Sequence, residues 1–508
     1  METLLPLQLD GRQLTLAEIE SVSVHNRPVA VTPEALVRVA ASRQVIEQIL
    51  ATSQTVYGVN TGFGKLADVG IPADKLAQLQ TNLVRSHACG LGESLSEPES
   101  RAMLLLRANV LAKGLSGVRT ELLHLLVDML NHGVHPVIPA KGSVGASGDL
   151  APLAHLALVV IGEGEAMHKG QCMPGAQALA EANLRPLQLV AKEGLALLNG
   201  TQAMTAVGVL SIQHARRLAQ AADLAGAMSL EALKGTPVAF DQRIHDARPH
   251  AGQIAAAANL SHLLEDSEIR QSHVANDPRV QDAYCLRCMP QVHGAVRGVL
   301  AHVAQILETE SGSATDNPLV FPAGEESSAE VLSGGNFHGA PLAYAFDYAA
   351  IALTDLASIS ERRIDRLINP DINEGLPAFL CSDAGLSSGY MIAHVTAAAL
   401  LNECKVLSHP SSVDSVPTSG GKEDHVSMGM TGALKLRQVA QNLEYILAIE
   451  LLCAAQGLDY RLPLKPSRSV EAAYQAIRTV VPHLGEDRSP APDIKAIAQL
   501  LRGRLAKY

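Results

Sequence analysis

Apolar residues recur along most of this chain at the spacing of α-helices. Within 122–130 they fall at intervals of three and four, which predicts one helical face directed to a core. Thr32-Pro33 is typical of a helix start, with the threonine as cap and the proline in the first turn. Residues 5–15 differ, because two short segments flank an Asp-Gly pair, which predicts a β-hairpin with a tight turn.

Three stretches are long, apolar and nearly free of helix breakers. They cover about residues 203–233, 341–368 and 431–456. Each exceeds the usual length of a globular helix and carries apolar residues on several faces. Such helices are typical of the middle of a large bundle, so the sequence predicts a mainly α fold.

The composition narrows the class of protein. Hydrophobic residues make up 47% of the 508 residues, which is enough for a large core and argues against disorder. The formal net charge is −11 and no basic block stands out, so we expect no nucleic-acid or anionic-membrane partner. Aromatic residues make up only 3%, which disfavours base-stacking surfaces.

Cysteine usage and the first residues point to a cytoplasmic protein. The seven cysteines are an odd number in a large chain, which predicts reduced thiols. Cys285 and Cys288 form one CxxC pair, but no second pair or suitably spaced histidines accompany it, so we expect no metal site. We see neither a signal peptide nor an uncharged apolar run of about 18 residues, so we expect no membrane partner.

Five loops are more distinctive than the helices that they join, and polar loops on a helical scaffold often carry chemistry. They are rich in Gly, Ser, Asn or Pro. They read YGVNTGFG (57–64), KGSVGASGDLAP (141–152), LLNGTQ (197–202), SGGNFHG (333–339) and PTSGGKEDH (417–425).

The second loop fits neither of two common motifs. It lacks the Lys-Ser/Thr of a phosphate loop, and Asp149 stands where a nucleophile elbow needs glycine. Another chemistry fits its Ala146-Ser147-Gly148. The Gly148 amide nitrogen can attack the Ala146 carbonyl carbon, because glycine is unhindered and tolerates unusual backbone angles. Loss of water from the ring and of the Ser147 hydroxyl would leave an electrophilic methylidene group.

The GSVGASGDLAPLAH segment resembles the signature of the aromatic amino acid ammonia-lyases and aminomutases. The other four loops resemble the same family in the same order, over nearly the whole chain. That family makes 4-methylidene-imidazol-5-one (MIO) from Ala-Ser-Gly, so the resemblance implies MIO at 146–148 and no external cofactor. The electrophile captures the substrate amine and turns its nitrogen into a better leaving group.

The resemblance also implies roles for four residues that would act on the β-carbon and the carboxylate. Tyr57 matches the motif tyrosine and is the first candidate for general base, although a phenol needs a lowered pKa for this role. Gln281, Tyr284 and Arg287 match site positions, and their spacing of three is that of one helix face. Arg287 would hold the substrate carboxylate, Tyr284 would be a second phenol, and Gln281 would hydrogen-bond the prosthetic group or the substrate.

Four further positions concern the amine and the side-chain pocket. Asn199 matches the residue beside MIO and the substrate amine, and Phe337 would line the same pocket. His87, in Ser-His, and Glu423 resemble the histidine-specific branch, because a carboxylate and an imidazole can bond the two ring nitrogens of a histidine substrate. Which group takes the β-proton stays open among Tyr57, Tyr284 and Glu423.

The chain departs from that branch at two places. Gly420, Gly421 and Lys422 stand where we expect Ala-Asn-Gln before Glu423, and Lys422 would pair with Glu423 or face solvent. Met289 stands where we expect a polar residue. Both departures concern the detailed geometry of the pocket more than the identity of the substrate.

The resemblance implies elimination of ammonia from L-histidine to give trans-urocanate, the first step of histidine degradation. It implies a fold like that of fumarase and aspartase, with an N-terminal α(+β) domain carrying the MIO loop (1–200), a central long-helix bundle (201–460) and a C-terminal helical segment (461–508). It also implies a homotetramer whose active sites each draw residues from three subunits.

Three other hypotheses remain. A tyrosine or phenylalanine ammonia-lyase or an aminomutase of the same family would differ in its product. A lyase of the fumarase/aspartase kind would show no dehydration at 146–148. A helical scaffold without enzymatic activity would be indifferent to the substitution Ser147→Ala.

Overall fold

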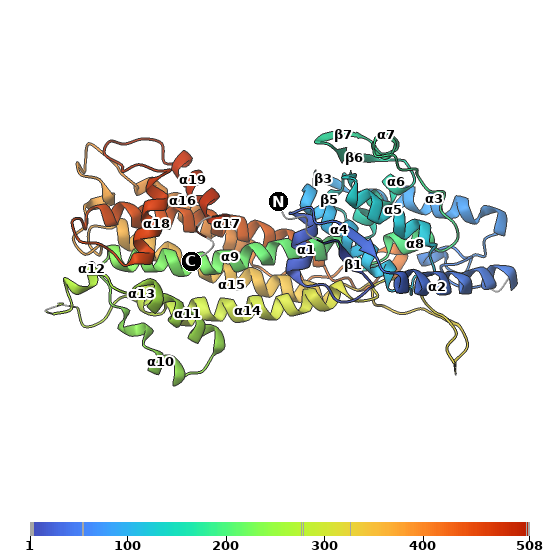
Figure 1. Cartoon of the computed structure of the whole chain (residues 1–508), viewed down its shortest axis with the longest axis horizontal. Helices are drawn as coiled ribbons and strands as arrows, with labels where there is room; N and C mark the ends of the chain where they lie inside the picture. The colour runs from blue at the N-terminus through green and yellow to red at the C-terminus, as the bar shows by residue number, and fades with distance from the viewer. Residues whose placement is uncertain are drawn as a thin grey trace. The chain divides into compact units, whose positions relative to one another are not determined.

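The computed structural model describes residues 5–52, 55–275, 277, 279–325, 327–503 and 505, and it is mainly α-helical (Figure 1). The mainly α fold expected from the sequence is confirmed. The chain divides into two compact units. Unit 1 comprises Met1–Leu210, Ala304–Phe346 and Pro410–Leu434, and unit 2 comprises Ser211–Val303, Asp347–His409 and Lys435–Tyr508. The domain boundaries expected at 200/201 and 460/461 stay a prediction.

Unit 1 holds the strands of the described residues together with the shorter N-terminal helices. The helices are α1 (Leu16–Ser23), α2 (Pro33–Thr52), α3 (Leu76–His87), α4 (Glu97–Ala112), α5 (Thr120–Asn131), α6 (Leu150–Val160), α7 (Gly175–Glu181) and α8 (Glu193–Leu198). The 3₁₀ turns are η1 (Gly64–Leu66), η2 (Ala73–Lys75) and η5 (Ser419–Gly421). The strands are β1 (Leu7–Leu9), β2 (Val29–Val31), β3 (Leu91–Ser94), β4 (His135–Pro136), β5 (Pro139–Lys141), β6 (Glu165–His168), β7 (Gln171–Pro174), β8 (Leu319–Phe321) and β9 (Glu330–Leu332).

These strands form small sheets rather than a layer. The pairs are β1 with β2, β3 with β5 and β8 with β9, and a three-stranded sheet has the order β4-β6-β7. The helix start predicted at Thr32-Pro33 is confirmed, since α2 begins at Pro33. The Ala35 N–H donates to the Thr32 hydroxyl at the start of α2, and the apolar face within 122–130 belongs to α5.

The hairpin predicted at 5–15 is wrong. β1 pairs in parallel with β2, with Leu7 opposite Val29. The turn after β1 does form, since the Arg12 N–H donates to Asp10 Oδ1 at 2.9 Å. The residues after it start α1 instead of a second strand, because Thr15 caps that helix in a capping box.

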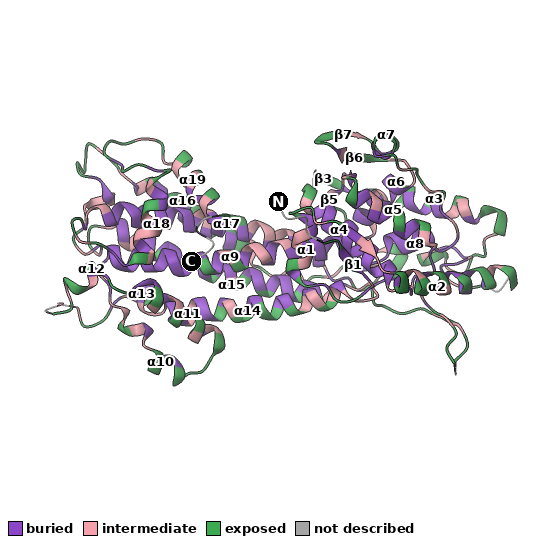
Figure 2. Ribbon diagram, in the orientation of Figure 1, coloured by how far each residue is buried: buried purple, intermediate pink, exposed green. Residues whose placement is uncertain are grey.

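Four long helices contribute residues to both units, and three of them are the stretches predicted from the sequence. They are α9 (Gln202–Ala232), α14 (Met289–Ser311), α15 (Ala340–Ile368) and α17 (Gly429–Asp459). Figure 2 shows burial along much of α9 and α17, as expected for helices with apolar residues on several faces. Among the described residues, α15 is long and apolar enough to cross a membrane, but 72% of its most apolar stretch is buried in the protein.

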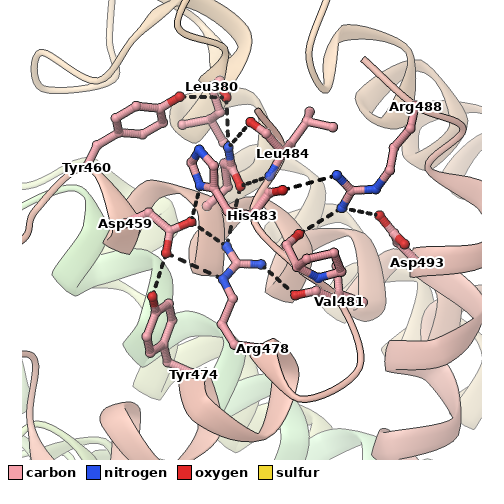
Figure 3. A network of polar contacts seen from close by, with 12 residues as sticks. Leu380, Asp459, Tyr460, Tyr474, Arg478, Val481, His483, Leu484, Arg488 and Asp493 are labelled. Carbon is pink, nitrogen blue, oxygen red and sulfur yellow. Dashed lines mark hydrogen bonds and ion pairs between the residues drawn. The ribbon is translucent and has the colours of Figure 1, made fainter. Parts of the chain in front are cut away.

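The regular elements of unit 2 are helices in the residues that the structure describes. Besides parts of the long helices it contains α10 (Gln242–Asp246), α11 (Ala251–Leu263), α12 (Glu268–Gln271), α13 (Tyr284–Arg287), α16 (Met391–Leu407), α18 (Arg468–Arg478) and α19 (Ala491–Leu501), with the 3₁₀ turns η3 (Pro237–Phe240) and η4 (Ala378–Leu380). A polar network around Asp459 joins the end of α17 to α18 and to the segment after it (Figure 3).

Candidate active site

The Ala-Ser-Gly tripeptide at 146–148 lies in unit 1, in the loop between β5 and α6. Gly148 has a φ of +71°, and a Cβ atom added to it would lie 2.1 Å from the Gly200 carbonyl oxygen. Only glycine fits there, as cyclisation through this residue requires. Gly145 also has a positive φ, and the Ser427 hydroxyl donates to its carbonyl oxygen at 2.9 Å. The loop is thus held in a bent conformation on both sides of the tripeptide.

Asp149 follows the tripeptide directly and is fully buried. Its Oδ1 accepts a hydrogen bond from the Ser143 hydroxyl at 2.7 Å, and its Oδ2 accepts one from the Met204 N–H at 2.8 Å. Burial raises the pKa of Asp149 to about 6 although these hydrogen bonds act against it. The side chain ties the loop to the start of α9. Our sequence reasoning used it only to reject a nucleophile elbow, although its place next to the tripeptide was a usable signal.

Glu423 contacts the tripeptide from the loop after η5. Its Oε1 accepts a hydrogen bond from the Ser147 hydroxyl at 2.5 Å, and its Oε2 accepts bonds of 2.8 Å from the hydroxyls of Thr418 and Ser419. Burial by itself would raise the pKa of Glu423, but these three hydrogen bonds and the nearby His87 outweigh burial and lower it. Glu423 is therefore an ionised carboxylate beside the serine that the cyclisation chemistry consumes.

Tyr57 lines the same cavity as Ser147 and Glu423, but its surroundings raise the pKa of its phenol instead of lowering it. Burial raises the pKa of its phenol, and the Glu423 carboxylate raises it further, whereas a hydrogen bond from the backbone of Gly64 lowers it only in part. A general base near neutral pH needs a lowered phenol pKa. Within the unit that holds Tyr57, the described surroundings keep this phenol protonated.

His87 is the last residue of α3, and of its two ring nitrogens only Nδ1 has a hydrogen-bond partner among the described residues. Nδ1 lies 2.8 Å from the Leu83 carbonyl oxygen. Since a carbonyl oxygen only accepts, Nδ1 carries the proton. In the neutral ring, Nε2 is then a hydrogen-bond acceptor available to a ligand N–H.

Asn199 follows α8 and is 4% exposed. Its Nδ2 donates to the backbone carbonyl oxygen of Asn317 at 3.1 Å. The backbone carbonyl oxygen of Asn199 accepts a hydrogen bond from Arg107 Nη1 at 2.8 Å. Its Oδ1 is buried and has no hydrogen-bond partner among the described residues. A buried acceptor left unpaired costs stability, so this oxygen suits a ligand that brings an N–H.

Tyr57, His87, Ser147, Asn199 and Glu423 line one cavity of about 300 Å³ in unit 1. Phe337 lines it, as the sequence predicts for a pocket residue. Sequence reasoning did not single out Asn317, Phe63 or Leu195, which also line it. The full lining is Tyr57, Phe63, Gly64, Lys65, Leu66, Leu83, His87, Ser147, Leu150, Leu195, Leu198, Asn199, Asn317, Phe337, Ser419 and Glu423.

Gln281, Tyr284 and Arg287 belong to unit 2, and none of them lines this cavity. The expectation that all three share one helix face is wrong, because α13 begins at Tyr284 and Gln281 precedes it. The Arg287 guanidinium lies 4.7 Å from the centre of the Tyr284 ring. Tyr284 is 71% exposed, and the buried Nε of Arg287 has no partner among the described residues.

The two departures from the family pattern have different surroundings. Lys422 is exposed and lines an adjoining cavity of about 380 Å³, which also touches Ser147 and Glu423. Met289 is fully buried in unit 2, where its sulfur fills the space that a Cβ at Gly226 of α9 would need. Met289 is therefore a packing residue of unit 2.

The described residues contain no group of three or more His, Cys, Asp or Glu side chains that could hold a metal ion. The seven cysteines are all free. Residues 146–148 themselves offer backbone groups and the single hydroxyl of Ser147, which are the groups that the cyclisation uses.

Residues 14–479 match the family model described as aromatic amino acid lyase. The chain belongs to the aromatic amino acid lyase family. The matched range includes all five loops that the sequence analysis singled out.

Three known proteins are similar to this chain over nearly its whole length. The histidine ammonia-lyase of Koribacter versatilis (strain Ellin345) is 55% identical over 509 residues, which cover 98% of this chain and 98% of that protein. The crystal structure of histidine ammonia-lyase from Trypanosoma cruzi is 44% identical with a TM-score of 0.91, covering 99% of this chain and 95% of that one. Tyrosine aminomutase from Streptomyces globisporus is 41% identical with a TM-score of 0.92, covering 99% and 98%. Since the fold is common to enzymes of different names, the substrate must be argued from the site.

Proposed function

We propose that this protein eliminates ammonia from L-histidine to give trans-urocanate. The observation that carries the proposal is the pairing of His87 and Glu423 around one cavity beside Ser147. One ring nitrogen of a histidine substrate can donate to the Glu423 carboxylate, and His87 Nε2 can accept from the other when the substrate ring is protonated. A phenylalanine side chain would leave the ionised Glu423 without a donor, and a tyrosine phenol has only one O–H, so it could not donate to both Glu423 and His87 Nε2.

The residues fit the prosthetic group that the family implies. Gly148 packs so closely on Gly200 that no side chain is tolerated, and no described residue bonds the Oδ1 of Asn199, which lines the same cavity as Ser147. MIO formed from residues 146–148 would supply the electrophile that binds the substrate amine and makes its nitrogen a better leaving group. No external cofactor is part of the proposal.

Side chains of this protein bind the substrate amine, limit the access of water and remove the β-proton. Asn199 Oδ1 accepts an N–H of the substrate amine and so fixes the orientation of the nitrogen. Phe337 forms part of the cavity wall, and its apolar ring would limit the access of water. The β-proton is taken by Tyr57, Tyr284 or Glu423, and the ionised Glu423 meets the protonation requirement at neutral pH directly.

We infer that the site is completed by other copies of this chain, in a homotetramer. Tyr57 needs a nearby cation before it can act as a base. Arg287 has a buried Nε without a partner in the part of the chain that the structure describes, and an exposed neighbour in Tyr284. Gln281, Tyr284 and Arg287 from another subunit would bring a cation to the substrate carboxylate and a second phenol to the β-carbon. A cytoplasmic location, with no metal, nucleic-acid or membrane partner, belongs to the same proposal.

The tyrosine aminomutase likeness makes an aromatic β-amino acid the alternative product. The test is to mix the protein with L-histidine, L-tyrosine and L-phenylalanine separately and to record ultraviolet absorbance, with β-amino acids measured by chromatography. We expect trans-urocanate from histidine and no product from the other two. Coumarate, cinnamate or a β-amino acid as the main product would overturn the assignment of His87 and Glu423.

A further inference from the structure

The short helix α8 connects Lys192 to Asn199, the residue that we propose to bind the substrate amine. The helix covers Glu193–Leu198, and all six of its residues are buried. Lys192 is its N-cap residue and Asn199 is its C-cap residue. Because so short a helix is a stiff spacer, the position of Asn199 depends on how both ends of α8 are held.

Both ends of α8 bond to the same short segment, residues 316–317. At the start of the helix, the Lys192 ammonium group donates to Asp316 Oδ2 at 2.7 Å, and both side chains are fully buried. At the end of the helix, Asn199 Nδ2 donates to the backbone carbonyl oxygen of Asn317 at 3.1 Å. Two consecutive residues therefore anchor the two ends of the helix.

Asp316 links this ion pair to the backbone of Asn317. Its Oδ1 accepts a hydrogen bond from the Asn317 N–H at 2.7 Å, while its Oδ2 accepts the one from Lys192. The Asn317 side chain is held as well, because its Oδ1 accepts from the Gly334 N–H at 2.7 Å and its Nδ2 donates to the Ser333 hydroxyl at 3.1 Å. Lys192 thus fixes the side chain of Asp316, and Asp316 in turn orients the backbone of Asn317.

The bond to Asn317 determines which end of the Asn199 amide is left for a ligand. A backbone carbonyl oxygen only accepts hydrogen bonds, so the amide must present its NH₂ group there. The Oδ1 of Asn199 then has no partner among the described residues, as the proposed contact with the substrate amine requires. Without a fixed Asn317 carbonyl group the amide could rotate, and its NH₂ group would then face the N–H groups of the substrate.

Stability alone is a poor explanation for this buried ion pair. Burial lowers the pKa of Lys192, and the charge of Arg107 lowers it further, whereas Asp316 opposes this shift only in part. Moving two charges out of water costs free energy that their attraction often fails to offset, so apolar side chains of the same size commonly stabilise a protein as well. The pair instead imposes a direction, because each oxygen of Asp316 accepts one defined hydrogen bond.

We propose that Lys192 and Asp316 are positioning residues of the elimination, which hold the Asn199 amide with its Oδ1 towards the substrate amine. The role rests on the proposed function, since it concerns one contact of the proposed substrate. Lys192 and Asp316, both among the described residues, do not line the cavity, so they act through Asn199. Their loss slows the elimination more than it weakens binding of the imidazole ring, which His87 and Glu423 would hold.

The first test is the kinetics of Lys192→Met in the intact protein. Methionine fills a similar space, a positive φ disfavours both residues alike, and Asp316 keeps the charge of the buried Arg107 nearby, so we expect the variant to fold. For L-histidine, kcat should fall by at least about tenfold while KM changes by less than about threefold. The chain should still be lighter than its sequence by two water molecules, which separates turnover from formation of the prosthetic group.

Arg119→Met is the matched control, because it removes the cation from another buried carboxylate at the start of α8. Arg119 Nη2 donates to Glu193 Oε2 at 2.8 Å, and the Glu193 side chain is fully buried. We expect this variant to unfold more easily while its kcat stays within about twofold of the native value. An equal fall of kcat in Arg119→Met and Lys192→Met would show that any disturbance of α8 is sufficient, and would overturn the proposal.

A double-mutant cycle shows whether Lys192 acts through Asn199. Asn199→Ala removes the amide, so adding Lys192→Met to it should lower kcat by less than about twofold further. Losses that multiply in the double variant would contradict the proposal. If Lys192→Met does not fold, Asp316→Asn replaces it in the cycle, because an amide has one acceptor oxygen and cannot bond both Lys192 and the Asn317 N–H.

The remaining outcomes separate this role from the proposed function. A native protein that does not turn over L-histidine would overturn the proposed function, and the positioning role with it. An active native protein with an unchanged kcat in folded Lys192→Met would overturn the positioning role alone. Loss of the mass difference in Lys192→Met, or failure of both Lys192→Met and Asp316→Asn to fold, would assign the ion pair to maturation or to stability and would also reject that role.

Discussion

Two carboxylates of this chain, Glu423 in unit 1 and Asp459 in unit 2, differ in the side chains that donate hydrogen bonds to them. Asp459 accepts hydrogen bonds from the Tyr474 hydroxyl, from Arg478 and from His483 Nδ1, at 2.5, 2.7 and 2.5 Å (Figure 3). Glu423 accepts from three hydroxyls, and the only one of them inside a reactive motif is that of Ser147.

The difference lies in the charge of the partners. Asp459 has the guanidinium of Arg478 in contact, so its charge is neutralised within the network and serves to join α17 to α18. Among the described residues, the hydrogen-bond donors to Glu423 are neutral hydroxyls, and Glu423 lies on a cavity, so its charge remains available to a ligand. Asp459, which is paired with a cation, thus stabilises the fold. Glu423, which is bonded by hydroxyls at a cavity, belongs to the candidate site.

The largest effect is expected from Ser147→Ala, which removes the hydroxyl that the cyclisation expels. Turnover of L-histidine should be abolished, while the free energy of unfolding changes by less than about 1 kcal/mol, as for a small change on a loop. Urocanate absorbance and denaturant unfolding measure the two quantities. Near-normal turnover by a folded Ser147→Ala protein would remove the tripeptide from the mechanism.

On the structural side of the comparison, Asp459→Ala should lower the free energy of unfolding by about 3 kcal/mol, because it leaves a partly buried Arg478 without its counter-charge. Denaturant titration measures this loss. Turnover per folded molecule should stay at the native level, and a selective loss of turnover would break the distinction between the two carboxylates.

Glu423→Gln is the matched experiment in unit 1. It keeps the shape but removes the charge, and we expect kcat to fall by at least about 100-fold, the usual contribution of a positioned acid–base group. Stability should change little, because hydroxyl donors can also bond an amide oxygen. Comparing kcat and unfolding for Glu423→Gln and Asp459→Ala shows whether the two effects are as separate as we propose.

Asp149→Asn tests a third carboxyl group, the buried one of Asp149, beside those of Glu423 and Asp459. The pKa of Asp149 in the folded chain is about 6, above its ordinary value, so its contribution to stability is full at low pH and is lost as pH rises through 6. We expect the variant to gain about 2 kcal/mol relative to the native protein between pH 4 and pH 8. Thermal unfolding over this pH range measures it, and parallel curves for the two proteins would contradict the burial argument.

Arg287→Ala has the smallest expected effect. Losing a carboxylate contact should lower kcat/KM by at least about tenfold, or 1.4 kcal/mol. Arg279→Ala is a useful comparison, because Arg279 already pairs with Asp277 within unit 2 and is expected to affect stability instead. An unchanged kcat/KM for Arg287→Ala would remove this residue from the proposed site.

The sequence predicted well what depends on local pattern. The three longest apolar stretches became α9, α15 and α17, because period and length alone distinguish such helices. The hairpin at 5–15 failed because β1 pairs with β2, a segment outside it, and local turn signals carry no information about distant partners.

The candidate site shows the same limit. The motif resemblance predicted Tyr57, His87, Asn199 and Glu423, which surround one cavity, but the pKa of Tyr57 depends on burial that no motif contains. The free Oδ1 of Asn199 likewise became visible only once its neighbours were placed.

The most direct test of the proposed chemistry is the mass of the intact chain in a preparation that turns over L-histidine. We expect a chain lighter than its sequence by two water molecules, with the loss located in the peptide that contains 146–148 and absent from Ser147→Ala. An active protein whose chain has the full mass of its sequence would contradict the proposal that this tripeptide becomes the electrophile.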